Sequence, residues 1–178
     1  GENYVQEAVD KIHELQGLDI EWHYIGHIQS NKTKLIATEF DWVHTVDREK
    51  IASRLNDARN GDPLNILIQV NVDLAVTKSG VSPTDLKALA MAIWKLPHLK
   101  LRGLMSIPDP VSENDLQRAH QQLKALFEEI KAGHPTPEIF DTLSMGMTND
   151  LELAISEGST MVRIGTALFG ARAPKETL

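Results

Sequence analysis

Two short segments near the carboxyl end of the chain carry residues that commonly bind phosphate. SMGMTND supplies Ser144, Gly146 and Thr148, and RIGTALFG supplies Gly165 and Thr166. Glycine lets a backbone N–H approach a ligand closely, and a hydroxyl adds a donor. If the segments are neighbours in the fold, their donors could surround one phosphate group. The alternative is that the glycines only permit turns and the hydroxyls only cap helices. Neither segment is a Walker loop or a dinucleotide fingerprint.

A single arginine, Arg163, interrupts the apolar run MVRIG directly before the second of these segments. A guanidinium that faces the inside of a protein needs a partner, because an unpaired buried charge is costly. Two partners remain open at this stage, a carboxylate of the chain or an electronegative atom of a ligand.

The histidines and lysines give weaker indications. His23 and His27 have a spacing that suits zinc only on a helix. HYIGH predicts strand and loop, so no metal site is expected. Lys32 and Lys78 lie in predicted loops, either as surface charges or at the mouth of a ligand site. A lysine that forms a Schiff base is usually desolvated, but Lys100 stands at the start of its predicted strand and no strand interior contains one.

Composition narrows the class of protein. The 178 residues are 42% hydrophobic and carry a formal net charge of −7, which predicts a single folded domain over 1–178. An acidic balance argues against a nucleic-acid surface. The chain has no cysteine, so it has no disulfide, thiolate nucleophile or cysteine-ligated metal, and a cytoplasmic location is expected. No apolar run approaches the roughly 18 residues of a membrane span.

The apolar pattern alternates between the helical and the strand period along the whole chain. Helices are predicted at 2–16, 30–40, 48–60, 82–95, 114–132 and 149–158, and strands at 20–26, 42–46, 64–72, 99–107, 140–146 and 160–170. Ser30, Asp47 and Ser82 are the predicted N-caps of three helices.

Strict alternation of strand and helix predicts a parallel sheet covered by helices, either an open doubly wound sheet or a barrel. Polar or glycine-rich residues follow nearly every predicted strand, and a ring of such loops is typical of a (β/α)8 TIM barrel. Only six strands are visible. We therefore expect the first strand and most of the second to precede Gly1, with GENYVQE at the end of the second.

Together these motifs resemble the pyridoxal 5′-phosphate (PLP) homeostasis protein family. The resemblance rests on GENYVQE, EWHYIGHIQSNK, QVNVD with TKSG, RGLMSIP, and SMGMTNDLELAISEGSTMVRIGTALFGAR. It covers essentially the whole chain, its last motif is the most specific, and it suggests a proteobacterial member.

The resemblance implies a barrel like the N-terminal domain of alanine racemase. It implies PLP held as a Schiff base by a lysine on the first strand, upstream of Gly1. It implies an intracellular carrier or regulator without established catalysis, a monomer, with apo PLP enzymes as possible recipients of the cofactor. Two other functions stay open: a PLP-dependent racemase or decarboxylase of the same fold, and a barrel that binds another phosphorylated metabolite.

The family pattern also implies roles for individual residues. Ser144, Gly165 and Thr166 would hold the phosphate, and Arg163 would face the pyridine nitrogen. The remaining expected cofactor-binding residues are Asn3 and His23 near the ring or mouth, Met145 and Gly146 beside Ser144, and Lys78 as an accessory lysine. An arginine stays protonated and keeps the pyridine nitrogen unprotonated, which weakens the ring as an electron sink. This arrangement suits holding the cofactor, although racemases of this fold share it.

Overall fold

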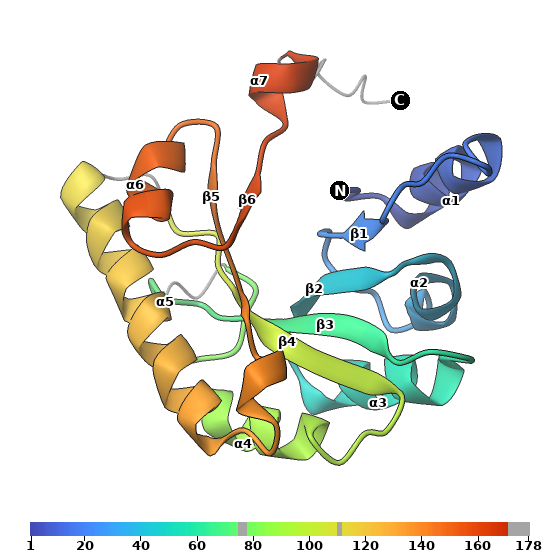
Figure 1. Ribbon diagram of the computed structural model, residues 1–178, viewed down its shortest axis with the longest axis horizontal. Coiled ribbons are helices and arrows are strands. Elements are labelled where there is room, and N and C mark those ends of the chain that lie inside the picture. Colours follow the sequence, from blue (N-terminus) through green and yellow to red (C-terminus); the bar gives the residue numbers. More distant parts are fainter. Residues whose placement is uncertain (75–77, 110–111, 171–178) are drawn as a thin grey trace.

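The protein is built on one curled sheet of six parallel strands with helices on its outer face (Figure 1). The computed structural model describes residues 1–74, 78–109 and 112–170. The strands are β1 (His23–Tyr24), β2 (Trp42–Val46), β3 (Leu64–Gln69), β4 (Leu99–Met105), β5 (Thr142–Met147) and β6 (Met161–Arg163). They lie side by side in chain order. A doubly wound sheet reverses its strand order, so this order identifies part of a barrel and agrees with the prediction.

The helices follow the strands as the periodicity predicts. They are α1 (Val5–Glu14), α2 (Thr33–Glu39), α3 (Glu49–Ala58), α4 (Leu86–Ile93), α5 (Glu113–Gly133), the short 3-10 turn η1 (Pro137–Ile139), α6 (Leu151–Ser156) and α7 (Thr166–Phe169). The segment predicted as a long final strand divides into β6 and α7. The predicted first strand shortens to two paired residues.

Two of the three predicted helix caps are wrong. Helix α2 begins after Lys32 without a side-chain cap, and the hydroxyl of Thr33 donates to the carbonyl of Ser30. Helix α3 begins after Arg48, and the carboxylate of Asp47 pairs with that arginine instead of capping the helix. Both helices begin later in the chain than predicted, so neither Ser30 nor Asp47 stands at the cap position. Ser82 does accept from a backbone amide, in the turn that leads into α4.

The sheet separates an apolar outer core from a more polar inner face. Alternate strand residues point to opposite faces, so Val43, Ile66, Leu104 and Leu143 pack under the helices in the large outer cluster. Trp42, Leu67 and Met105 form a small separate cluster. His44 on β2 contacts Ser144 on β5 although two strands lie between them. Such a contact must cross the concave side, so this side is the inside of the barrel.

Glu2 lies at the next strand position beside β1. Its N–H donates to the carbonyl of His23 at 2.8 Å, and its carbonyl accepts from Ile25 at 2.9 Å, in the parallel sense. This pairing agrees with the expectation that GENYVQE enters α1 from a strand. A Cβ on Gly26 would lie 2.0 Å from the carbonyl oxygen of Asn3, so only glycine permits this approach.

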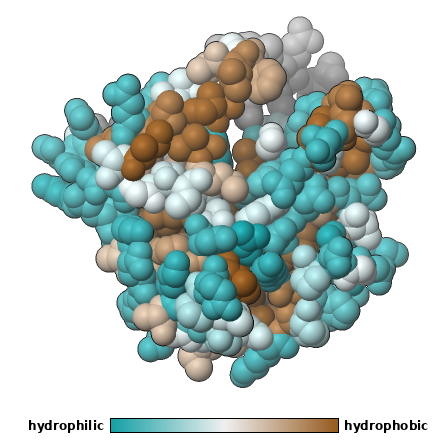
Figure 2. All heavy atoms as spheres, viewed as in Figure 1, coloured by the Kyte–Doolittle hydropathy of each residue, from teal (hydrophilic) through white to brown (hydrophobic). Residues whose placement is uncertain are grey.

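The opposite edge of the sheet, at β6, carries exposed apolar side chains. Figure 2 shows hydrophobic residues gathered around β6 and α7, where Leu168 and Phe169 are 71% and 86% exposed. The surface on this side is therefore less polar than most of the face in view.

Candidate functional site

Arg163 stands at the end of β6 and is held by the two preceding strands. Its Nη1 donates to the backbone carbonyl of Ser144 at 2.9 Å and to the Ser144 hydroxyl at 2.8 Å. Its Nη2 donates to the carbonyl of Ser106, just after β4, at 2.8 Å. Burial lowers the pKa of the guanidinium to about 10, so Arg163 is still protonated at neutral pH. In the described part of the chain no carboxylate forms an ion pair with it, which excludes one of the two predicted partners there.

Ser144 connects this arginine to a buried histidine. The hydroxyl of Ser144, on a fully buried side chain, lies 3.1 Å from Nδ1 of His44. Burial lowers the pKa of His44 to about 2, and the charges of His23 and Arg163 act in the same direction. His44 is therefore neutral across the physiological range.

His23 continues the same line of contacts toward the start of β1. Its Nδ1 lies 2.8 Å from Nε2 of His44, and its Nε2 lies 3.3 Å from a carboxylate oxygen of Glu21. Burial lowers the pKa of His23 and outweighs the opposite effect of Glu21. The hydrogen bond that Trp42 Nε1 donates at 2.8 Å lowers the pKa of Glu21. We call this line, Glu21–His23–His44–Ser144–Arg163, the hydrogen-bond chain.

Trp42 supports the end of the hydrogen-bond chain that contains Glu21 and His23. The His23 ring stacks parallel to the Trp42 ring, with 5.3 Å between ring centroids and 6° between planes. The guanidinium of Arg102 lies 4.8 Å from the Trp42 centroid and pairs with Asp141 at 2.6 Å. These contacts fix the His23 ring, so the position of its two nitrogens is set by packing.

The two segments predicted to bind phosphate are neighbours in the fold. Met147 at the end of β5 pairs with Arg163 at the end of β6. Behind the first segment, Asp150 accepts from the Met147 N–H at 2.7 Å and contacts buried His120 at 2.9 Å. The turn that follows β5 is therefore fixed from its outer side, which leaves its inner side for a ligand.

Glycine is required in the first of these segments and leaves space in the second. Gly146 has φ +93°, and a Cβ there would lie 2.4 Å from Cβ of Ala154. Gly165 caps α7 and has no atom within 4 Å of an added Cβ. Thr166 follows it on the exposed surface. An open backbone and a hydroxyl thus lie together at the end of β6.

Three other residues predicted to bind the cofactor do not place their side chains beside Arg163. The side chain of Met145 is fully buried in the outer core, so only its backbone could contact a ligand on the inner face. Asn3 lies beside β1, on the other side of the barrel interior from β6. Lys78 stands apart from the hydrogen-bond chain, in the loop that follows β3 and in contact with the loop that follows β4.

Lys78 is an ion-pair centre in this structure. Its ammonium lies 2.9 Å from both Asp73 and Asp109 and donates to the carbonyl of Ile107 at 3.0 Å. Burial acts to lower the pKa of Lys78, but the hydrogen bonds to Asp73 and Asp109 outweigh it and the pKa is raised. A charged lysine with these partners connects two loops and is a poor nucleophile.

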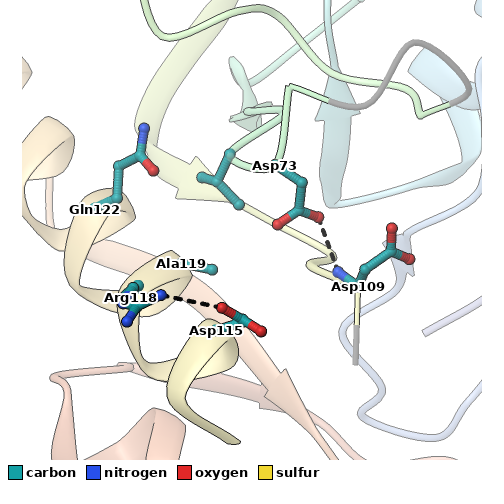
Figure 3. Close-up of a pocket in the computed structure, with 7 residues that line it drawn as sticks. Asp73, Asp109, Asp115, Arg118, Ala119 and Gln122 are labelled. Atoms are coloured by element: carbon teal, nitrogen blue, oxygen red, sulfur yellow. Dashed lines mark hydrogen bonds and ion pairs between the residues drawn. The ribbon is translucent and has the colours of Figure 1, made fainter. Parts of the chain in front are cut away.

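The same loops border a cleft of about 330 Å³ against α5 (Figure 3). It is lined by Val72, Asp73, Asp109, Asp115, Arg118, Ala119 and Gln122. Arg118 pairs with Asp115 at 3.2 Å. None of these residues belongs to the predicted site, so the cleft is a separate surface feature.

Sequence reasoning missed three members of the site, Glu21, His44 and Ser106. His44 had one available signal, because it lies two residues after Trp42 and therefore on the same face of its strand. Glu21 and Ser106 carried none, since their roles depend on partners from other strands.

Comparisons with known proteins place the chain in a family. Residues 1–173 match the model of the alanine racemase N-terminal domain. The pyridoxal phosphate homeostasis protein of Haemophilus influenzae is 55% identical over 177 residues, which cover 97% of this chain and 74% of that protein. The Escherichia coli K12 protein of the same name is 53% identical over 178 residues, covering 97% and 75%. The chain belongs to the pyridoxal phosphate homeostasis protein family.

Solved structures agree. PipY of Synechococcus elongatus PCC7942, without PLP, is 36% identical with a TM-score of 0.87, over 96% of this chain and 80% of that one. The structure of the same protein with PLP bound is 35% identical to this chain with a TM-score of 0.85, again over 96% of this chain and 80% of that one. An alanine racemase from Corynebacterium glutamicum, 14% identical with a TM-score of 0.69, covers 92% of this chain and 47% of its own. At that identity the likeness shows the fold alone.

None of the helices in the described part of the chain has the length and apolar character needed to cross a bilayer. Among the described residues, no group of three or more histidines, aspartates or glutamates is arranged to hold a metal ion.

Proposed function

We propose that this protein binds PLP on the inner face of its barrel and acts in PLP homeostasis as a carrier or regulator. The observation that carries the proposal is Arg163, a partly buried, protonated guanidinium whose three described hydrogen bonds leave Nε–H and one Nη2–H free. The homeostasis proteins of H. influenzae and E. coli, and PipY with its bound PLP, support the choice of cofactor.

The residues present fit the two ends of the cofactor. Arg163 would donate to the pyridine nitrogen. Gly165, Thr166 and Thr148 would surround the phosphate, because they lie on the adjacent turns that follow β5 and β6. The Ser144 hydroxyl is buried between Arg163 and His44, so we assign it to the guanidinium and not to the phosphate. Asn3 and His23 would face the ring from the side of β1.

Bound PLP supplies an aldehyde that captures amines and a ring that can withdraw electrons. Arg163 only donates hydrogen bonds and stays protonated, so the pyridine nitrogen opposite it would remain an acceptor without a proton. This favours holding the cofactor over carbanion chemistry, and we infer that the protein is not an enzyme. The likeness of its fold to alanine racemase keeps a racemase-like enzyme as the second candidate.

The lysine that would capture the aldehyde is proposed to lie upstream of Gly1. Lys100 starts β4, at the opposite end from the loops, and Lys78 is committed to two carboxylates. We also propose a single domain over 1–178, an eight-stranded barrel once upstream strands join the edges at Glu2 and β6, a cytoplasmic monomer, and apo PLP enzymes as recipients.

The test is PLP binding by the protein in its full natural length. We expect a visible absorbance band on adding PLP, and one lysine adduct after borohydride reduction, located by mass spectrometry. Arg163→Gln should shift the band or weaken binding about tenfold or more, since a charged hydrogen bond is lost. Arg54→Gln is the matched control, because Arg54 is exposed and its one hydrogen bond among the described residues goes to the backbone carbonyl of Ser30. Absence of binding would refute the function, and racemisation well above that of free PLP would favour the enzyme.

A further inference from the structure

The hydrogen-bond chain has a fixed direction, because each of its ends can act in only one way. A carboxylate accepts hydrogen bonds and cannot donate them, and a guanidinium donates and cannot accept. Glu21 stands at the first end and Arg163 at the other, with two imidazoles and one hydroxyl between them.

The protonation of each ring follows from the Glu21 end. Because Glu21 is an acceptor, Nε2 of His23 must carry a proton. His23 is neutral, since burial lowers its pKa, so its Nδ1 is an acceptor and receives the proton of His44 Nε2 across 2.8 Å. His44 is neutral for the same reason, and its Nδ1 must in turn accept.

The acceptor at His44 Nδ1 decides what the Ser144 hydroxyl does. Among the described residues that hydroxyl is the one hydrogen-bond partner of His44 Nδ1, so it donates its single proton to His44 across 3.1 Å. Its lone pairs then face Arg163, which donates to the same oxygen at 2.8 Å. With the opposite tautomers, an unprotonated Nε2 of His23 would face the carboxylate of Glu21, and two acceptors would meet. Only one assignment therefore pairs a donor with an acceptor at every contact of the hydrogen-bond chain.

We propose that His44 is a positioning residue for Arg163, acting through Ser144. By accepting a hydrogen bond from Ser144, His44 turns the O–H bond away from the guanidinium. The lone pairs of the Ser144 oxygen then face Arg163 and accept from it. The guanidinium is then held by three acceptors, from β5 and from the residue after β4. Its free N–H groups are thereby directed at the ligand. The expected effect on PLP binding rests on the proposed function, but the assignment of the tautomers does not.

The same geometry gives the hydroxyl of Ser144 a role different from the one that the sequence motif implied. Its proton is committed to His44, and its side chain is fully buried. It therefore has no proton to offer a phosphate while the chain is intact. Ser144 belongs to the machinery that orients Arg163.

The first test measures tautomers without any ligand. Long-range ¹H–¹⁵N correlation spectra of the ¹⁵N-histidine-labelled, full-length protein should show His23 and His44 neutral and protonated at Nε2 at pH 7, and His44 should stay neutral at pH 6. Protonation of either ring at Nδ1, or a charged His44, would overturn the assignment. Arginine labelling should resolve separate Nη signals for Arg163, because its rotation is restricted.

Three variants separate positioning from folding. His44→Phe keeps a ring and removes both hydrogen bonds, so the Arg163 Nη signals should average. His44→Asn places an amide oxygen near the Nδ1 position and should restore the separate signals in part. Thr45→Val on the same strand removes a bond to the Gly26 carbonyl, outside the chain, and should leave Arg163 unchanged. Averaging in Thr45→Val, or none in His44→Phe, would contradict the proposal.

PLP titration then links the chain to binding. We expect His44→Phe to bind about tenfold more weakly, and His44→Asn to lie between it and the wild type. Equal affinities of His44→Phe and wild type would refute the positioning role. If the wild type binds no PLP, the proposed function fails, while the spectra still decide the direction of the chain.

Discussion

His44 should make the protein sensitive to mild acid. An unfolded histidine has a pKa of about 6.5, whereas burial lowers the pKa of folded His44 to about 2. Between these values the unfolded chain binds a proton that the folded chain does not. Unfolding therefore becomes easier as the pH falls. Two titratable groups act on His44, His23 on β1 and Arg163 on β6, and a positive charge on either disfavours its protonation.

The size of the effect follows from the two pKa values. From pH 7 to pH 5 the proton uptake of unfolded His44 removes about 2 kcal/mol from the free energy of unfolding, at up to about 1.4 kcal/mol per pH unit. A domain has only about 5–15 kcal/mol in total. His23 and His134, whose pKa values burial also lowers, act in the same direction.

Urea denaturation at a series of pH values from 5 to 8 measures this dependence. In His44→Phe the fall in unfolding free energy from pH 7 to pH 5 should be smaller than in the wild type by about 2 kcal/mol. Thr45→Val, on the same strand, should keep the wild-type slope. Parallel curves for wild type and His44→Phe would show that His44 titrates normally in the folded protein and would refute the reasoning.

Two further substitutions test the turn that follows β5. Gly146→Ala should destabilise by about 2–4 kcal/mol, because a methyl group at φ +93° would meet Ala154. Gly61→Ala, at φ +83° with open space around it, should cost only about 1–2 kcal/mol, and equal losses would show that the contact relaxes freely. Asp150→Ala should cost about 3 kcal/mol by leaving His120 and the Met147 amide without their acceptor. Exposed Asp57→Ala is its control, and a loss below about 1 kcal/mol at Asp150 would indicate that water replaces the carboxylate.

The order of helices and strands was predictable, because each depends on the spacing of apolar residues within a short segment of the chain. Runs such as LNILIQ carry a strand pattern, and the segment from Glu113 to Gly133 carries a helical one. The ring of polar residues after the strands indicated a barrel, and the strand order agrees with part of one. The predicted caps at Ser30 and Asp47 were wrong, because α2 and α3 begin later in the chain, after Lys32 and Arg48.

The site was predictable only in part. Arg163 and the two turns were identified because arginine in an apolar strand and glycine after a strand are unusual in themselves. Met145 was predicted from its place in the motif, and its side chain is buried in the outer core, so only its backbone could contact a ligand. His44 was missed because its neighbours in sequence are ordinary strand residues.

The sequence by itself determined the alternation of strands and helices, the adjacency of the turns after β5 and β6, and the family. All of these depend on residues close together in the chain or on a motif. Only the tertiary structure decided which groups Ser144 and His44 contact. Curling the sheet brings β2 against β5, strands separated by 100 residues at His44 and Ser144. The direction of a hydrogen bond is then set by which donors and acceptors remain at each end of the chain, and this depends on every strand that contributes to it.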